Sequence, residues 1–298
     1  MIIDCKKISQ DIIERLKAQP KPTKFLAAVL VGKDASSISF LKQKEKIAKE
    51  LGIDFRLYEF RDTIKNDELR DEVLKISKHK TCGGVIVQLP LPEHINKHYI
   101  LNVIPREKDV DVLGERALGA FYTGRNPVLP PAVATLEEIL KAKSYKLKAS
   151  KVAVVGLGFL VGKPISVWLE GNPVKNVKFA SQITSHGARC KEILLFDEGS
   201  DFLLLREADL VISGVGKAGI IKPEMLKSEA VVIDFGYSQE VTGEVGHETR
   251  KSSGDFDSSV HNSAFIIQHS ISYTPTPGGT GPILVAKLLE NFYKLTKC

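Results

Sequence analysis

The sequence predicts an α/β protein built from two α/β domains. Helical patterns alternate with short apolar strands along the whole chain, and one loose stretch rich in glycine, proline and tyrosine interrupts them at residues 117–132. A further helix follows this stretch, and the alternation then resumes with a strand that leads into a glycine-rich turn. Such alternation is typical of parallel sheets flanked by helices. A chain of 298 residues is long enough for one large or two ordinary domains.

The first part of the chain contains three helical patterns and three strand patterns. Apolar residues recur at helical spacing in the first set and form short continuous runs in the second. Gly52 follows the second helix, where glycine commonly ends a helix. The predicted helices are 9–16, 36–51 and 66–78, and the predicted strands are 25–31, 53–58 and 84–89.

The second part of the chain follows a helix predicted at 133–143 and a polar stretch that ends at Ser150. We place a domain junction in that polar stretch, because a new strand begins directly after it. The predicted strands start at Lys151 and continue near 193–196, 210–213 and 231–234, and the last helix is predicted at 283–295.

The composition and charge favour one class of ligand and disfavour several classes of protein. A net charge of +6 favours an anionic ligand such as a phosphate or a polycarboxylate. The chain lacks the basic blocks with interleaved aromatic residues that nucleic-acid binding would use, and it lacks an apolar run long enough to span a membrane. Its four cysteines are widely scattered, which predicts reduced thiols and no metal site. The N-terminus has no signal-peptide pattern, so we expect a cytoplasmic protein.

The segment from Pro275 to Pro282 packs three prolines and three glycines into eight residues. Proline stiffens a backbone, and glycine lets a ligand approach it closely. The segment therefore suits a flat, rigid ligand, although a tight turn entering the last helix is the alternative interpretation.

A glycine-rich turn joins the strand that starts at Lys151 to a following helix. Gly156 and Gly158 would let the backbone approach a pyrophosphate at the helix N-terminus, and Gly162 and Pro164 open the helix. The spacing G-x-G-x-x-x-G is one residue longer than the usual dinucleotide-binding pattern. The segment predicts a dinucleotide site, with a plain turn as the alternative.

The next predicted strand ends in Asp197, an acid that could accept hydrogen bonds from the adenosine ribose and repel a 2′-phosphate. The stretch between Gly156 and Gly162 contains no Arg or Lys. Both features favour NAD over NADP. Asp197 lies further from the glycine turn than the acid of the usual pattern does, because the polar segment 171–190 intervenes. The alternative is that Asp197 simply begins a turn.

Lys44 lies on the apolar face of the helix predicted at 36–51, together with Phe40 and Ile47, whereas Lys42 and Lys46 lie on the opposite face. A buried amine is costly without a partner, and burial moves its pKa toward values useful in acid–base chemistry. The alternative is a lysine whose ammonium group returns to water along the surface.

Two polar residues could meet this lysine. Gln88 interrupts an apolar strand near its carboxyl end, where open parallel sheets bind ligands, and Asp111 follows another apolar segment. An amine, an amide and a carboxylate together could grip a nitrogen heterocycle and move one proton. Taken separately, Gln88 and Asp111 could equally cap strand ends.

Taken together, these motifs resemble the methylenetetrahydrofolate dehydrogenase/methenyltetrahydrofolate cyclohydrolase family (FolD type) nearly end to end. The combination of Val-Gln-Leu-Pro-Leu-Pro with Pro-Gly-Gly-x-Gly-Pro is specific. The matching segments are Ile3–Lys6, Val31–Asp34, Leu51–Ile53, Val87–Pro92, Lys108–Asp111, Gly156–Pro164, Val232–Gly236, Gly254–Asp255, Pro275–Pro282 and Leu289–Asn291.

The resemblance implies two domains around a cleft. Residues 1–143 with 275–298 would bind folate, the C-terminal helix returning to this domain, and residues 144–274 would form a Rossmann-type NAD(P)-binding domain. The family oxidises 5,10-methylenetetrahydrofolate by hydride transfer, and most members then hydrolyse the methenyl form to 10-formyltetrahydrofolate. Family members are commonly homodimers.

The resemblance also assigns site residues. It implies that Lys44 is the catalytic lysine, Gln88 its partner, and Asp111 the carboxylate that binds the pterin. The remaining substrate positions are Phe40, Val87, Leu89, Pro277, Gly278, Gly279, Thr280 and Gly281, and the cofactor positions are Gly156, Leu157, Gly158, Gly162, Asp197 and Tyr237.

The sequence departs from the family pattern at six positions in four places. Phe40 replaces the usual tyrosine and lacks its hydroxyl, and Val112 replaces a glycine. The stretch Pro127–Pro130 lacks the usual cysteine and threonine, and Leu157-Gly158 replaces an Arg-Ser pair. The changes raise two alternatives: a monofunctional NAD-dependent dehydrogenase with weak or no cyclohydrolase activity, and a non-catalytic folate- or dinucleotide-binding protein. A third alternative, a dehydrogenase for another small substrate, would use the same nucleotide domain but would not explain the motifs of the first domain.

Overall fold

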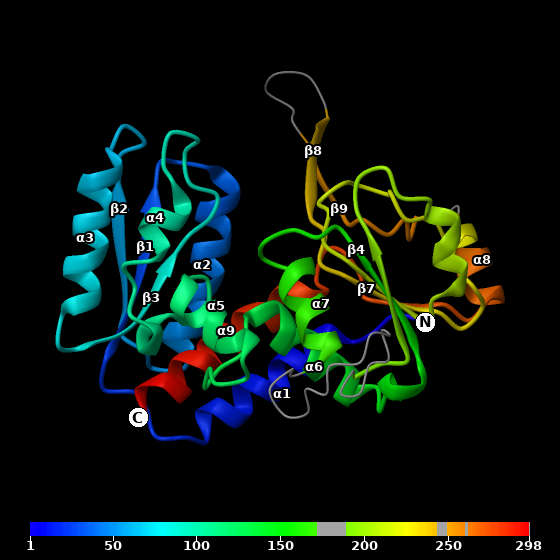
Figure 1. Ribbon diagram of the computed structural model, residues 1–298, viewed down its shortest axis with the longest axis horizontal. Coiled ribbons are helices and arrows are strands. Elements are labelled where there is room, and N and C mark those ends of the chain that lie inside the picture. The colour runs from blue at the N-terminus through cyan, green and yellow to red at the C-terminus, as the bar shows by residue number, and fades with distance from the viewer. Residues whose placement is uncertain (172–188, 243–248, 260–261, 298) are drawn as a thin grey trace, which may run out of the picture. The chain divides into compact units, whose positions relative to one another are not determined.

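The computed structural model describes residues 1–171, 189–242, 249–259 and 262–297. The chain divides into two compact units. The first unit contains Gln10–Ala134 and Leu284–Cys298, and the second contains Met1–Ser9 and Thr135–Ile283. Each unit has its own parallel sheet flanked by helices (Figure 1).

The first unit is built on a three-stranded parallel sheet in the order β2-β1-β3. The central strand is flanked on both sides, with Val29 opposite Tyr58 on one side and Val87 on the other. All residues of β1 and β3 are buried, as expected for continuous apolar runs in a sheet covered on both faces. The strands are β1 (Phe25–Val31), β2 (Phe55–Phe60) and β3 (Cys82–Val87).

Helices connect and cover these strands. The second helix begins at a capping residue, Asp34, whose carboxylate accepts a hydrogen bond of 2.7 Å from the backbone N–H of Ser37. The helices up to residue 142 are α1 (Cys5–Lys17), α2 (Ala35–Glu50), α3 (Asn66–Lys78), α4 (Lys97–Leu101), η1 (Arg106–Lys108), α5 (Glu115–Tyr122) and α6 (Pro131–Ala142). By their contacts, the first residues of α1 and most residues of α6 are assigned to the second unit.

The C-terminal part of helix α9 (Thr280–Thr296) completes the first unit. Phe292 is fully buried against β3, where a side chain at Gly84 would come within 2.9 Å of its ring. The Asn291 amide donates hydrogen bonds to the carbonyl oxygens of Val110, at 2.9 Å, and Leu129, at 2.8 Å. The predicted return of the last helix to the first domain is therefore confirmed.

The second unit contains a five-stranded parallel sheet in the order β10-β7-β6-β4-β5. The chain runs from β4 outward to β5 and then places β6 on the other side of β4. This reversal is the kind of switch point outside which open α/β sheets bind ligands. The strands are β4 (Lys151–Val155), β5 (Glu192–Phe196), β6 (Leu210–Ser213), β7 (Val231–Asp234) and β10 (Ser272–Tyr273).

Short helices and one hairpin surround this second sheet. The pair β8 (Ser238–Thr242) and β9 (Thr249–Ser253) is antiparallel and was not predicted from the sequence. The helical segments are η2 (Leu147–Ala149), α7 (Gly162–Glu170), η3 (Phe202–Glu207), η4 (Pro223–Met225) and α8 (Ser263–Gln268). Every described helix is too short or too polar to traverse a lipid bilayer.

The predicted α/β architecture is confirmed, but the units divide differently from the expected domains. Residues 1–9, 135–143 and 275–283 belong by their contacts to the second unit. For the N-terminus the reason is backbone pairing with β10. The N–H of Ile3 donates to the carbonyl oxygen of Tyr273 at 2.8 Å, and the N–H of Tyr273 donates to that of Met1 at 2.9 Å.

Replacing Asn291 should destabilise the first unit. Asn291→Leu leaves two carbonyl groups without their donor in a buried position, so we expect a loss of roughly 2–4 kcal/mol in the free energy of unfolding. Chemical denaturation measures this loss. Lys294→Gln, at an exposed position of the same helix, serves as the control and should change stability by less than about 0.5 kcal/mol. An Asn291→Leu protein as stable as the control would contradict the assignment.

Candidate active site

Helix α2 and the end of strand β3 bring Lys44 and Gln88 together. Lys44 is half-buried, whereas Lys42 and Lys46 on the same helix are exposed. The Lys44 ammonium donates a hydrogen bond of 3.0 Å to the Gln88 carboxamide oxygen. Gln88 is itself held, because its backbone N–H donates to the carbonyl oxygen of Val29 at 2.9 Å and its side-chain amide to that of Leu89 at 2.7 Å.

Asp111 completes this group of three side chains in the first unit. Burial lowers the pKa of the Lys44 amine, and the negative charge of Asp111 opposes that shift. Burial likewise raises the pKa of the Asp111 carboxyl group, and the positive charge of Lys44 opposes it. Burial therefore favours the neutral form of both the amine and the acid, which makes proton transfer at a bound ligand easier.

The segment that carries Asp111 is fixed by its neighbours. Asp109 pairs with Val85 through an isolated parallel bridge beside β3. The Asp109 carboxylate is 2% exposed and accepts hydrogen bonds from the backbone N–H groups of Leu113, at 3.0 Å, and Gly114, at 2.8 Å. These bonds hold the turn that follows Asp111.

Val112 occupies the centre of this turn with a φ angle of 58°. That left-handed conformation is costly for a β-branched residue and suits glycine. It gives a physical reason for the glycine that the resembled family usually has at this position. The Val112 side chain is fully buried, so its apolar packing offsets part of the backbone strain.

The other predicted folate contacts in the first unit lie near Lys44 and Gln88 in the sequence. Phe40 is half-buried on α2, one helical turn before Lys44. Val87 is buried and Leu89 is half-buried, on either side of Gln88.

The predicted substrate loop belongs by its contacts to the second unit. Two of its glycines are required by the backbone, because Gly278 has a φ angle of 88° and a side chain at Gly279 would lie 2.1 Å from the carbonyl oxygen of Pro275. Pro277 and Gly281 complete the loop, and a side chain at Gly281 would meet open space. The Thr280 hydroxyl donates to the carbonyl oxygen of Asp234 at 3.0 Å, which ties the start of α9 to the end of β7.

The turn from β4 to α7 has the geometry of a dinucleotide-binding turn. Gly156 adopts a φ angle of 81°, and a side chain at Gly162 would lie 1.9 Å from the Gly156 carbonyl oxygen. Gly162 thus permits the close approach of helix and strand that the third glycine of such turns provides, despite the longer spacing. Gly158 and Leu157 lie between them, and a side chain at Gly158 would meet only the Gly214 carbonyl oxygen, at 4.0 Å.

A pocket of about 410 Å³ lies at the carboxyl ends of these strands. Gly156 lines it, together with Asp197 and Glu198, which follow β5, and Val215 and Lys217, which follow β6. The pocket thus joins the predicted glycine turn to the predicted acid. The backbone N–H of Asp197 also donates to the Ser200 hydroxyl at 2.9 Å, so this residue begins a turn as well.

Tyr237 lies directly before β8, and its backbone faces the loop after β6. A side chain at Gly216 would lie 3.9 Å from the Tyr237 carbonyl oxygen. Its phenol group is partly exposed and lies 3.1 Å from the Ser252 hydroxyl.

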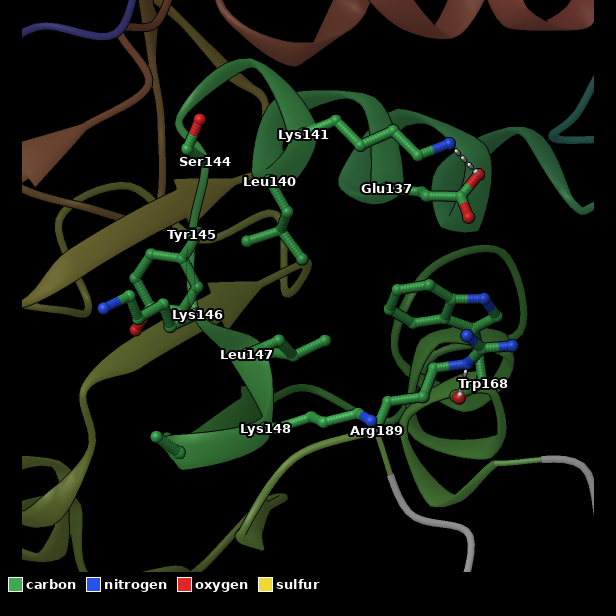
Figure 2. Close-up of a pocket in the computed structure, with 11 residues that line it drawn as sticks. Glu137, Leu140, Lys141, Ser144, Tyr145, Lys146, Leu147, Lys148, Trp168 and Arg189 are labelled. Carbon is green, nitrogen blue, oxygen red and sulfur yellow. Dashed lines mark hydrogen bonds and ion pairs between the residues drawn. The ribbon is translucent and has the colours of Figure 1, made fainter.

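A larger pocket of about 660 Å³ lies on the second unit between α6, η2 and α7 (Figure 2). Two of its cationic groups, Lys141 and Arg189, contact other residues of the pocket lining. Lys141 forms an ion pair with Glu137 at 3.3 Å, and the Arg189 guanidinium covers the Trp168 ring at 4.6 Å while donating to the Trp168 carbonyl oxygen. The pocket at the strand ends, with its bare backbone and acids, is therefore the better candidate for a nucleotide.

Two consecutive parts of the chain match domains of known proteins. Residues 3–111 match the tetrahydrofolate dehydrogenase/cyclohydrolase catalytic domain, and residues 130–298 match the NAD(P)-binding domain of the same enzymes. The chain belongs to the tetrahydrofolate dehydrogenase/cyclohydrolase family. The family resemblance predicted from the sequence is thus confirmed.

Individual relatives of this family cover almost the whole chain. The chain is 30% identical over 293 residues to the bifunctional protein FolD of Clostridium perfringens, covering 98% of this chain and 95% of that protein. It is 31% identical over 285 residues to FolD of Bacillus licheniformis, with 96% and 90% covered. The crystal structure of FolD from Campylobacter jejuni superposes with a TM-score of 0.82 at 28% identity, covering 100% of this chain and 98% of that one.

Sequence reasoning missed three residues that shape these two sites. The family motifs contain Asp109 and Asn291 but assign them no role, yet these residues fix the segment around Asp111. Glu198 lines the nucleotide pocket beside Asp197, and its position directly after the predicted acid was the available signal.

Asp109 should make the stability of this family member depend on pH. Burial raises the pKa of Asp109 to about 7, the nearby Asp111 charge adds to this shift, and the N–H groups of Gly114 and Leu113 oppose it. In the unfolded chain an aspartate has a pKa of about 3.9. The folded state therefore favours the protonated acid, and this contribution to stability is present below about pH 4 and is lost as the pH rises to about 7.

The variant Asp109→Asn tests this dependence because asparagine cannot ionise. We expect the stability of the variant relative to the wild type to rise by at least about 1.4 kcal/mol between pH 4 and pH 8, the equivalent of one pKa unit. Urea denaturation at a series of pH values measures this difference. A difference that stays constant with pH would contradict the prediction.

Proposed function

We propose that this chain oxidises 5,10-methylenetetrahydrofolate to the methenyl form with NAD(P), and hydrolyses the methenyl form to 10-formyltetrahydrofolate. The hydrogen bond between Lys44 and Gln88, with Asp111 beside them, carries the proposal. It is supported by the family to which both units belong and by the glycine turn at the switch point of the second sheet.

In the proposed mechanism the three polar side chains of the first unit have separate roles. Asp111 anchors the pterin through its carboxylate. Gln88 orients Lys44, whose lowered pKa suits it to move a proton at a folate nitrogen and then to assist attack of water on the methenyl carbon. The loop Pro277–Gly281 is proposed to lie against the flat folate, since its bare backbone admits close approach.

The dinucleotide is proposed to bind at the glycine turn. When bound, NAD(P) supplies the hydride acceptor. The residues present fit a dinucleotide. The φ angle at Gly156 favours glycine, and the close approach of the Gly156 carbonyl oxygen leaves no room for a side chain at Gly162. Tyr237 is proposed to border the nicotinamide side through its backbone.

We propose that the cofactor is NAD rather than NADP. Asp197 and Glu198 line the pocket and would repel a 2′-phosphate, and Leu157 provides no positive charge in the turn. Lys217 lines the same pocket, and its positive charge would partly offset the negative charges of these two acids.

Phe40 bears on the balance between the two activities. Without a hydroxyl group it cannot tune the Lys44 amine by hydrogen bonding. We therefore propose a cyclohydrolase step that is weak relative to dehydrogenation. A monofunctional NAD-dependent dehydrogenase is the alternative. The intact contact between Lys44 and Gln88 disfavours a non-catalytic binding protein.

We further propose a homodimer in the cytoplasm. The strand β5 forms an edge of the described sheet, and Leu195 on it is 48% exposed, as is typical of a surface that pairs with another chain. The buried free thiols of Cys5, Cys82 and Cys190 are compatible with a reducing compartment.

Lys44→Met should nearly abolish hydrolysis of methenyltetrahydrofolate while the protein still folds. The substitution removes the proton donor but keeps a side chain of similar length, so we expect a rate at least about 100-fold lower. The decay of methenyl absorbance measures the rate. Lys42→Met, on the exposed face of the same helix, is the control and should retain wild-type activity. Full hydrolysis by Lys44→Met would remove this residue from the mechanism.

The wild-type dehydrogenase should prefer NAD. We expect kcat/KM with NAD to exceed that with NADP by at least about tenfold, about 1.4 kcal/mol of discrimination. Parallel absorbance assays with methylenetetrahydrofolate and each cofactor measure this ratio. The double variant Asp197→Ser/Glu198→Ser should narrow it by improving the use of NADP. Equal kcat/KM values for both cofactors in the wild type would contradict the preference.

A further inference from the structure

We propose that Asp255 is a positioning residue for dinucleotide binding, because it holds in place the loop Ser213–Lys217 that lines the nucleotide pocket. This inference rests on the proposed dinucleotide site. Asp255 lies in the segment after β9, far in sequence from the glycine turn, and it is fully buried.

Four donors from the loop converge on the two oxygens of the Asp255 carboxylate. Its Oδ2 atom accepts from the Ser213 hydroxyl at 2.6 Å and from the Val215 N–H at 2.7 Å. Its Oδ1 atom accepts from the N–H groups of Gly216 at 2.9 Å and Lys217 at 2.8 Å. Three consecutive backbone N–H groups aimed at one point form an anion-binding nest, and here the protein fills it with its own carboxylate.

The neighbouring backbone leaves room for this carboxylate. A side chain at Gly236 would lie 2.1 Å from the Asp255 carboxyl carbon. Gly254 likewise leaves room for Asp234, because a side chain there would lie 2.2 Å from an Asp234 carboxylate oxygen. The segments Val232–Gly236 and Gly254–Asp255, which resemble family motifs, thus fit together as one packed structure.

The loop held by Asp255 packs against the dinucleotide turn. A side chain at Gly156 would approach the Val215 side chain to 2.8 Å, and one at Gly214 would approach the Val161 side chain to 2.7 Å. Val215 and Lys217 form one wall of the pocket, and Gly156 and Asp197 form another. If the carboxylate is removed, three N–H groups lose their acceptor and this wall loses the contacts that set its position.

The variant Asp255→Asn tests the role because it keeps the size of the side chain but replaces one acceptor oxygen with a donor. We expect the Kd for NADH, measured by fluorescence, to rise at least tenfold, and the KM for NAD to rise with it. The KM for methylenetetrahydrofolate and the rate of methenyltetrahydrofolate hydrolysis, which consumes no dinucleotide, should stay within twofold of the wild type. Ser213→Ala, which removes one of the four donors, should raise the Kd by a smaller factor.

Asp209→Asn is the matched control. Asp209 accepts a hydrogen bond of 2.7 Å from the backbone N–H of Lys151 and pairs with Lys227, so it also anchors the same sheet, but at the amino ends of β4 and β6. Its replacement should lower the melting temperature without changing the Kd for NADH.

The outcomes separate this inference from the proposed function. A wild-type protein that binds neither NADH nor NADPH would overturn the proposed dinucleotide site itself. A wild type that binds NADH, together with folded Asp255→Asn and Ser213→Ala proteins that bind it equally well, would overturn the role of Asp255 alone. Equal losses of hydrolysis and NADH binding in both variants would also overturn it, since they would show general destabilisation.

Discussion

Buried carboxylates that collect the backbone N–H groups of loops are the interaction on which both sites depend. Where a parallel strand ends, the chain leaves the sheet and its N–H groups need new acceptors. In the first unit Asp109 accepts from Leu113 and Gly114, and in the second Asp255 accepts from Val215, Gly216 and Lys217. Each aspartate thus fixes a loop that contains or faces a candidate functional group.

The group around Lys44 illustrates how opposing electrostatic effects shape a site. Burial disfavours the charge on Lys44 and the charge on Asp111, and the attraction between the two charges offsets part of that cost. Gln88 adds a neutral acceptor that fixes the direction of the amine without adding charge. An amine held in this way retains a defined position while its proton becomes easier to release.

The nucleotide turn is governed by steric limits rather than by charge. The backbone at Gly156 and Gly162 comes so close that no side chain fits at Gly162, and one extra residue between the glycines is accommodated without loss of that approach. In the proposed cofactor site, the choice between NAD and NADP would then depend on the side chains that follow β5 and β6, because two acids and a lysine there line the same pocket. In the proposed site, the approach to a pyrophosphate and the choice between NAD and NADP would therefore depend on different segments.

The sequence alone determined the α/β class, most of the strands, the inward face of α2 and the glycine turn, because these follow from local periodicity and from backbone conformations that only glycine allows. It also determined the family, through motifs that are each a short continuous segment of the chain. Only the tertiary structure decided that residues 1–9 and 135–143 join the second unit, that Asn291 holds the carbonyl group before Asp111, and that Asp255 holds a loop about 40 residues earlier. These contacts join residues far apart in sequence, and no local pattern encodes which buried polar group will satisfy which distant backbone group.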